Sequence, residues 1–286
     1  MMNIQAFMKR HAVLTYFVLT FAISWGGILI AFGPGGIPAS LEQLEKLGPS
    51  AYLAMLAGPS VASILLTGLI DGRAGMRGLL ARLLRWRVGA GWYAVALLTT
   101  PLLATVVPLA LLLLSPEFLP GIFTTDDKSS LLLSGLAAGL MVGIFEELGW
   151  TGFAIPRLRL RYGILTAGLI VGLLWGAWHF LLFWESDSFF GALPLALLLE
   201  RLFSWLPPFR ILMVWVYDRT ESLLVVMLMH ASLVASQVIL MPATISGIPL
   251  LIYILIWAAA LWIAVGCVGV AHRGQLSQKP LQSRTA

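Results

Sequence analysis

Long runs of apolar residues, separated by short polar connections, repeat along the whole sequence. A helix needs about 20 mainly apolar residues to cross the hydrocarbon core of a bilayer. The runs that approach or exceed this length cover residues 12–33, 51–70, 92–115, 131–153, 166–184, 191–216, 222–242 and 248–271. We therefore expect an all-α, polytopic membrane protein with about eight transmembrane helices.

The composition agrees with this expectation and gives no sign of a separate soluble domain. Hydrophobic residues make up 59% of the 286 residues and charged residues only 11%, whereas soluble domains carry about 25% charged residues. We expect one transmembrane domain over residues 1–273 and a short polar cytoplasmic tail over residues 274–286. Cys267 is the single cysteine, which excludes an internal disulfide and a metal site built from several thiolates.

Lysine and arginine concentrate in the short connections on one side of the expected membrane. The basic residues of this side are Lys9, Arg10, Arg73, Arg77, Arg82, Arg85, Arg87, Arg157, Arg159, Arg161, Arg219, Arg273, Lys279 and Arg284. The acidic residues of the other side are Glu42, Glu45, Glu117, Asp126, Asp127, Glu185 and Asp187. Because cytoplasmic loops are enriched in Lys and Arg, both termini are expected in the cytoplasm. The net charge of +5 follows this topology and does not indicate a nucleic-acid partner.

Two stretches depart from the simple pattern of spans and loops. In residues 77–87, leucines share one helical face and arginines lie on the others, which predicts an amphipathic helix on the inner leaflet or a basic loop that only fixes orientation. The sixth apolar segment contains Glu200 and Arg201, which could neutralise each other, followed by Pro207 and Pro208. Proline interrupts a helix, so two short helices or a span with a broken middle are expected there.

One pair of adjacent glutamates and the only two histidines inside apolar runs lie on three different expected spans. Glu146 and Glu147 lie in the fourth span, His179 in the fifth and His230 in the seventh. An acidic residue near the centre of a spanning helix costs about 3 kcal/mol, so such residues need partners or a function. All three spans place these residues in the cytoplasmic half if Arg157–Leu165 runs along the membrane interface. Adjacent residues point about 100° apart, so one carboxylate is expected to face a cavity and the other a neighbouring helix.

These residue types suit hydrolysis by an activated water molecule. A carboxylate and an imidazole can act together as a general base. Glu146, His179 and His230 are also a suitable ligand set for Zn²⁺ with one position open for water, and the sequence leaves both arrangements open. The chain has no G-x-S-x-G or H-E-x-x-H motif and no cysteine nucleophile within reach. The alternative is that the four residues only connect helices by hydrogen bonds.

Four motifs in this order resemble those of the CPBP intramembrane proteases, a family named after CAAX prenyl proteases and bacteriocin-processing enzymes. The motifs are EELGWTGF at 146–153, LWGAWH at 174–179, WVYDRT at 215–220 and MHAS at 229–232. The resemblance covers about residues 146–236. It implies that Glu146 activates water, that His179 assists and that His230 binds the developing oxyanion. It also implies a structural role for Glu147, paired with an arginine four residues further on.

The sequence departs from the family pattern at three positions. Thr151 replaces the arginine, so Glu147 is expected to lack its cation. Trp175 replaces a phenylalanine, which is a mild change. Val234 replaces an asparagine four residues after the second histidine and cannot donate a hydrogen bond to an oxyanion. Ser232 and Gln237 are the candidate substitutes, although Ser232 points off the His230 face.

We therefore expect an intramembrane endopeptidase that cleaves membrane-associated, prenylated or leader peptides in a cavity open towards the cytoplasm. Its expected partners are membrane lipids and a peptide or lipidated substrate, and its expected location is the plasma membrane, most simply that of a bacterium. Two alternatives stay open. A family member impaired in catalysis could serve as a membrane scaffold or bacteriocin-immunity protein, and buried Glu and His could form the relay of a proton-coupled transporter.

Overall fold

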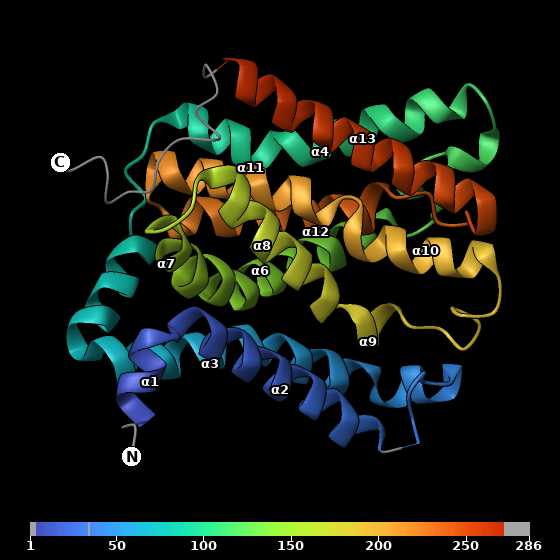
Figure 1. The fold of residues 1–286 in the computed structure, drawn as a ribbon. Helices are drawn as coiled ribbons and strands as arrows, with labels where there is room; N and C mark the ends of the chain where they lie inside the picture. The colour runs from blue at the N-terminus through green and yellow to red at the C-terminus, as the bar shows by residue number, and fades with distance from the viewer. Residues whose placement is uncertain (1–3, 34, 272–286) are drawn as a thin grey trace.

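The computed structural model describes residues 4–33 and 35–271, and within them every regular element is helical (Figure 1). The long helices are α2 (Ala12–Phe32), α3 (Leu41–Leu83), α4 (Ala90–Leu112), α6 (Lys128–Gly149), α8 (Ile164–Trp178), α10 (Ala192–Phe203), α11 (Leu206–Thr220), α12 (Leu223–Leu240) and α13 (Gly247–Ala271). The short ones are α1 (Ile4–Arg10), η1 (Pro116–Phe118), α5 (Gly121–Thr124), η2 (Trp150–Ala154), α7 (Ile155–Arg159) and α9 (Phe180–Phe183). The polar tail expected at 274–286 lies outside the described residues.

The chain is an all-α, multi-pass membrane protein, as its apolar runs predict. Within the described residues, six helical stretches are long and apolar enough to cross a membrane. They are α2, α3, α4, the continuous stretch Lys128–Arg159, α12 and α13. Of the other two predicted spans, the fifth is the 15-residue helix α8, and the sixth is divided between α10 and α11. Pro207 and Pro208 stand in the first turn of α11, where proline is tolerated, so they mark a helix start.

Helix α6 lies at the centre of the bundle, between α3 on one side and α12 on the other (Figure 1). Helices α2 and α3 pack together, α11 packs on α8, and α12 also contacts α4. Glycine lets α6 approach α12 closely, because a Cβ added at Gly143 would lie 2.5 Å from the backbone oxygen of Met227. This contact brings the carboxylates of α6 next to His230 of α12.

On the other side of the site, a glycine on α8 lets that helix approach α10 just as closely. A Cβ at Gly176 would lie 1.9 Å from the backbone oxygen of Leu202, on α10. A Gly176→Ala substitution should therefore lower the unfolding free energy by about 1–3 kcal/mol or more, because backbone must shift. Thermal unfolding in detergent measures this, with Gly266→Ala on α13 as the control, since nothing lies within 4 Å of a Cβ there. Equal melting temperatures for both variants would contradict close packing at Gly176.

The arginine-rich connections gather at one end of the bundle, which we call the basic end (Figure 1). It comprises α1, α7, the segment after Gly72 and the end of α11. Ion pairs hold it together, joining Arg157 to Asp71, Arg159 to Asp218, and Arg85 to Glu221. The opposite end, with the start of α3, α5 and the loop after α9, carries most of the acidic residues and is called the acidic end.

The helix predicted over residues 77–87 is present up to Leu83 as the last part of α3, set off by a kink at Gly72, whose φ is +61°. Its leucines do not form one buried face, since Leu79 is buried against Leu223 and Met227 while Leu80 is exposed. Because glycine adopts positive φ readily, Gly72 allows α3 to turn at the basic end.

Candidate active site

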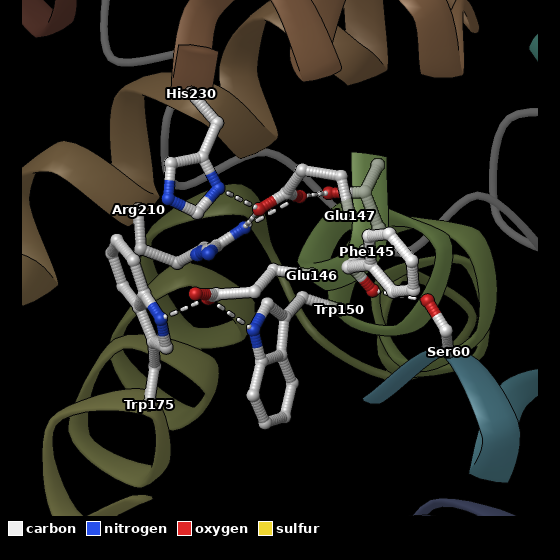
Figure 2. Close-up of polar contacts among 9 residues, drawn as sticks. Ser60, Phe145, Glu146, Glu147, Trp150, Trp175, Arg210 and His230 are labelled. Atoms are coloured by element: carbon white, nitrogen blue, oxygen red, sulfur yellow. Dashed lines mark hydrogen bonds and ion pairs between the residues drawn. The ribbon is translucent and has the colours of Figure 1, made fainter. Parts of the chain in front are cut away.

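Helix α6 carries Glu146 and Glu147 in its last turn, and both side chains are buried (Figure 2). A short π-helix, η2, follows directly, a feature that is frequent at functional sites. Helix α3 fixes this turn, because the hydroxyl of Ser60 donates to the carbonyl of Phe145 and that of Ser63 to the carbonyl of Leu148. The backbone around the two carboxylates is therefore held from a second helix.

Glu147 is bound on both carboxylate oxygens by neighbouring helices. Nη1 of Arg210, on α11, lies 2.9 Å from Oε1 and 2.8 Å from Oε2. Nδ1 of His230, on α12, lies 2.8 Å from Oε1, and the hydroxyl of Thr151 donates to Oε2 (Figure 2). Because Arg210 and Glu147 are both fully buried, this ion pair is kept from water. Glu147 thus joins three helices, as a structural residue would.

Arg210 corrects the expectation that Glu147 lacks a cation. Thr151 does occupy the motif position of the arginine, but the positive charge comes from α11 instead, where the guanidinium also lies 4.3 Å from the centre of the Trp175 ring. The sequence signal was an arginine in the otherwise uncharged stretch 206–216. A second expectation was also wrong, because Arg201 pairs with Glu185 and not with Glu200.

Glu146 receives two indole hydrogen bonds, both on the same oxygen. Nε1 of Trp150 lies 3.0 Å from Oε2 and Nε1 of Trp175 lies 2.6 Å from it (Figure 2). Within the described chain Oε1 receives no hydrogen bond, so this oxygen is available to a ligand. Trp175 is more than the mild change from phenylalanine that the motif predicts, because its N–H supplies a donor that phenylalanine lacks. Trp150 was missed as a donor, although its position four residues after Glu146 was the signal.

Backbone and carboxylate partners fix the orientation of both histidine rings. His179 follows the last residue of α8, and its Nδ1 lies 2.8 Å from the carbonyl oxygen of Trp175. Because a carbonyl only accepts, Nδ1 carries the proton and Nε2 has the free lone pair. His230 is oriented in the same way by Glu147, with Nδ1 donating to the carboxylate. Both rings are thus held through Nδ1.

Glu146, His179 and His230 line one cavity of about 140 Å³, as their predicted depths required. Helix α8 begins at Ile164, near the end of the stretch Arg157–Leu165 that is expected along the membrane interface, because the chain turns after α7. A water molecule takes about 30 Å³, so the cavity has room for several. Glu147 faces α11 and α12 instead, which confirms the predicted division between the two carboxylates.

Val234, which stands where the family motif has an asparagine, also lines this cavity. Val234 and Gln237 both line it, one and two turns beyond His230 on α12. Ser232 is turned away, with its hydroxyl 3.0 Å from the carbonyl oxygen of Leu97 and 3.0 Å from the hydroxyl of Thr100. Gln237 is therefore the better placed of the two candidate substitutes.

The cavity adjoins a larger one at the acidic end, whereas the sequence predicts an opening at the basic, cytoplasmic end. The larger cavity measures about 820 Å³ and shares Tyr52, Met55 and Leu182 with the site. Its other walls include the first turns of α3 and the loop that carries Glu185 and Asp187. Towards the basic end, in contrast, aromatic side chains that are fully buried close the site, and these are Tyr16, Trp150 and Phe153.

The proposed zinc set of Glu146, His179 and His230 does not form a metal cluster in the described chain. No group of three His, Cys, Asp or Glu side chains there lies close enough together to hold a metal ion. We therefore derive no step through a metal.

A protein family with known members matches the part of the chain that contains the site. Residues 128–236 match the family described as type II CAAX prenyl endopeptidase Rce1-like. The chain is similar to the Rce1-like endopeptidases over this region. The region runs from the first residue of α6 into α12 and contains both carboxylates, both histidines and Arg210. This match confirms the resemblance to the CPBP family that the motifs indicated.

A curated relative supports the Rce1-like assignment over a shorter stretch. The chain is 40% identical over 67 residues to CAAX prenyl protease 2 of Methanococcus maripaludis. The alignment covers 23% of this chain and 23% of that protein, so the chain aligns with less than a quarter of the relative's length.

Proposed function

We propose that this protein is an intramembrane endopeptidase that hydrolyses peptide bonds with a water activated by Glu146 and His179. The observation that supports this most directly is the shared cavity. Glu146 presents an oxygen without a protein donor, and His179, held through Nδ1, lines the same space. The match of residues 128–236 to the Rce1-like endopeptidases supports the same chemistry.

In this mechanism a water molecule in the cavity donates one hydrogen bond to Oε1 of Glu146 and another to Nε2 of His179. Glu146 takes a proton as the water oxygen attacks the carbonyl carbon of the substrate. The His230 ring, which Glu147 orients through Nδ1, is placed to bind the developing oxyanion through Nε2. The proton on Glu146 then passes to the departing amine nitrogen as the C–N bond breaks, which releases an amine and a carboxylic acid. The acid loses the second water proton to the solvent.

The walls of the two adjoining cavities suit a peptide with apolar side chains. Tyr52, Met55 and Leu182 join the site to the larger cavity, whose rim carries Glu185 and Asp187. We propose that an apolar peptide segment, with or without a prenyl group, enters from the acidic end. We place the protein in a bacterial plasma membrane. Its arginines predict that the basic end faces the cytoplasm, so this entrance faces the outer side.

The test is a cleavage assay with the purified protein in detergent. Labelled peptides of three kinds are offered: prenylated C-terminal peptides, the same peptides without the lipid, and apolar leader peptides. Mass spectrometry identifies the products, and a Glu146→Gln preparation made in parallel controls for contaminating proteases. Cleavage by the wild type alone supports the proposal. Failure to cut any peptide, under conditions in which the M. maripaludis relative is active, would favour the impaired scaffold. A parallel reaction with chelator tests for a metal.

Val234 gives a prediction on the oxyanion side of the site. Because Val234 lines the cavity one turn beyond His230, a Val234→Asn substitution adds a donor where the family motif has one. We expect kcat to rise by up to about 10²-fold, the usual effect of one oxyanion donor. The matched control is Val238→Asn, on the same helix but exposed. An unchanged rate for Val234→Asn would indicate that Gln237 or another group already serves the oxyanion.

A further inference from the structure

A separate cavity of about 540 Å³ lies at the basic end, on the other side of the aromatic wall from the active site. It is formed by α1, the first turns of α2, the kinked part of α3, α7 and α8, and Figure 1 shows these elements gathered at that end. None of its lining residues belongs to the Glu146 cavity.

Its rim is strongly basic. Lys9, Arg10, Arg157 and Arg161 line it, together with a single carboxylate, that of Asp71. Asp71 is already paired with Arg157, whose guanidinium also donates to the carbonyl of Phe153 and stacks on that ring, 3.5 Å from its centre. In the part of the chain that the structure describes, the other three cations have no carboxylate partner. The rim therefore holds an excess of positive charge.

Below this rim the cavity wall is apolar. Leu14 and Phe17 of α2, Ile70 of α3, and Ile170 and Leu174 of α8 form it. Both α2 and the α3 segment before the kink are apolar enough to span a membrane, so this wall continues the lipid-facing part of the bundle. A ligand that fills the cavity needs an anionic head and an apolar chain.

We propose that this cavity binds one anionic phospholipid of the leaflet at the basic end. Its phosphate lies among Lys9, Arg10 and Arg161, and an acyl chain runs along Phe17, Ile170 and Leu174. Basic pockets between transmembrane helices on the cytoplasmic side bind anionic headgroups, where each Lys or Arg adds to the attraction. A free phosphate would meet the same cations, but it would leave the apolar wall uncovered. The site is independent of the proposed peptidase activity.

The experiment measures lipid binding to the full-length protein after exchange into detergent without lipid. Phosphatidylglycerol, phosphatidylcholine with the same acyl chains, and soluble glycerol 3-phosphate are added separately. We expect phosphatidylglycerol to give a bound lipid by native mass spectrometry and to raise Tm by a few degrees, because a ligand of the folded state stabilises it. Phosphatidylcholine and glycerol 3-phosphate should give neither effect. An equal shift with glycerol 3-phosphate would overturn the lipid assignment in favour of a free anion.

Three variants separate this site from general surface charge. Lys9→Gln/Arg10→Gln/Arg161→Gln should weaken phosphatidylglycerol binding by about 10²-fold. Arg73→Gln/Arg77→Gln/Arg87→Gln removes as many exposed cations from the same end but outside the cavity, and should bind as the wild type does. Leu174→Trp fills the apolar wall with all cations kept and should also lose the lipid. Wild-type binding by the first triple variant or by Leu174→Trp, or equal losses in both triple variants, would overturn the proposal.

Discussion

Replacing Glu146 by glutamine should abolish peptide cleavage while the fold stays intact. Glutamine has nearly the same shape and its carbonyl oxygen can still accept the hydrogen bonds from Trp150 and Trp175. It cannot take a proton from water, however, and a positioned general base typically contributes about 10²–10⁴-fold in rate. We therefore expect kcat to fall by this factor with little change in Tm, measured by peptide cleavage and by thermal unfolding in detergent.

Replacing the neighbouring carboxylate, Glu147, should change stability and so provides a contrast to Glu146→Gln. Glu147→Gln should lower Tm, because it leaves the buried Arg210 without its counter-charge. Glu117→Gln, at an exposed position, should change neither quantity. If Glu146→Gln lowered Tm as much as Glu147→Gln and left kcat unchanged, Glu146 would be a structural residue and the proposed mechanism would be wrong.

Replacing Arg210 by methionine should have the largest effect on stability in this chain. Arg210 is fully buried and is the cation that Glu147 pairs with, so its loss leaves a carboxylate buried with only His230 and Thr151 as partners. Breaking a buried ion pair from one side costs about 3–5 kcal/mol. We expect a clear drop in the melting temperature in detergent, together with loss of cleavage because His230 is oriented through Glu147.

A second substitution shows whether this cost comes from the unpaired charge. Glu147→Gln/Arg210→Met removes both charges and should be more stable than the Arg210→Met variant alone. Arg219→Met, on the same helix but exposed, should unfold at the wild-type temperature. An Arg210→Met protein as stable as the wild type would show that the ion pair contributes nothing to holding α6 against α11.

The sequence predicted the fold well because apolar length and proline position act locally. Each of the eight apolar runs contains at least one helix, and the division of the sixth follows from Pro207 and Pro208. The convergence of Glu146, His179 and His230 was also predictable, since depth along a helix follows from residue count.

Features that depend on how one helix is rotated against another were not predictable in this way. Residue count places Arg210 at a depth but does not say that it faces Glu147, and Trp175 gave no sign of donating to Glu146. The end of the bundle at which the site adjoins a larger cavity was not predictable for the same reason. The depth of a residue below the basic surface does not reveal which side of the site is closed by side chains. Here Tyr16 and Phe153 close the side towards the basic end.

The counter-charge of Glu147 comes from a later helix, and this affects how the chain is inserted into the membrane. A carboxylate paired four residues further on would be neutralised within its own helix as it leaves the ribosome. In this protein Arg210 is separated from Glu147 by 63 positions. Glu147 must therefore enter the bilayer, or wait beside the insertion machinery, before its counter-charge has been synthesised. Biogenesis of this chain should accordingly depend more on the order of helix insertion than that of a relative with the arginine at the motif position.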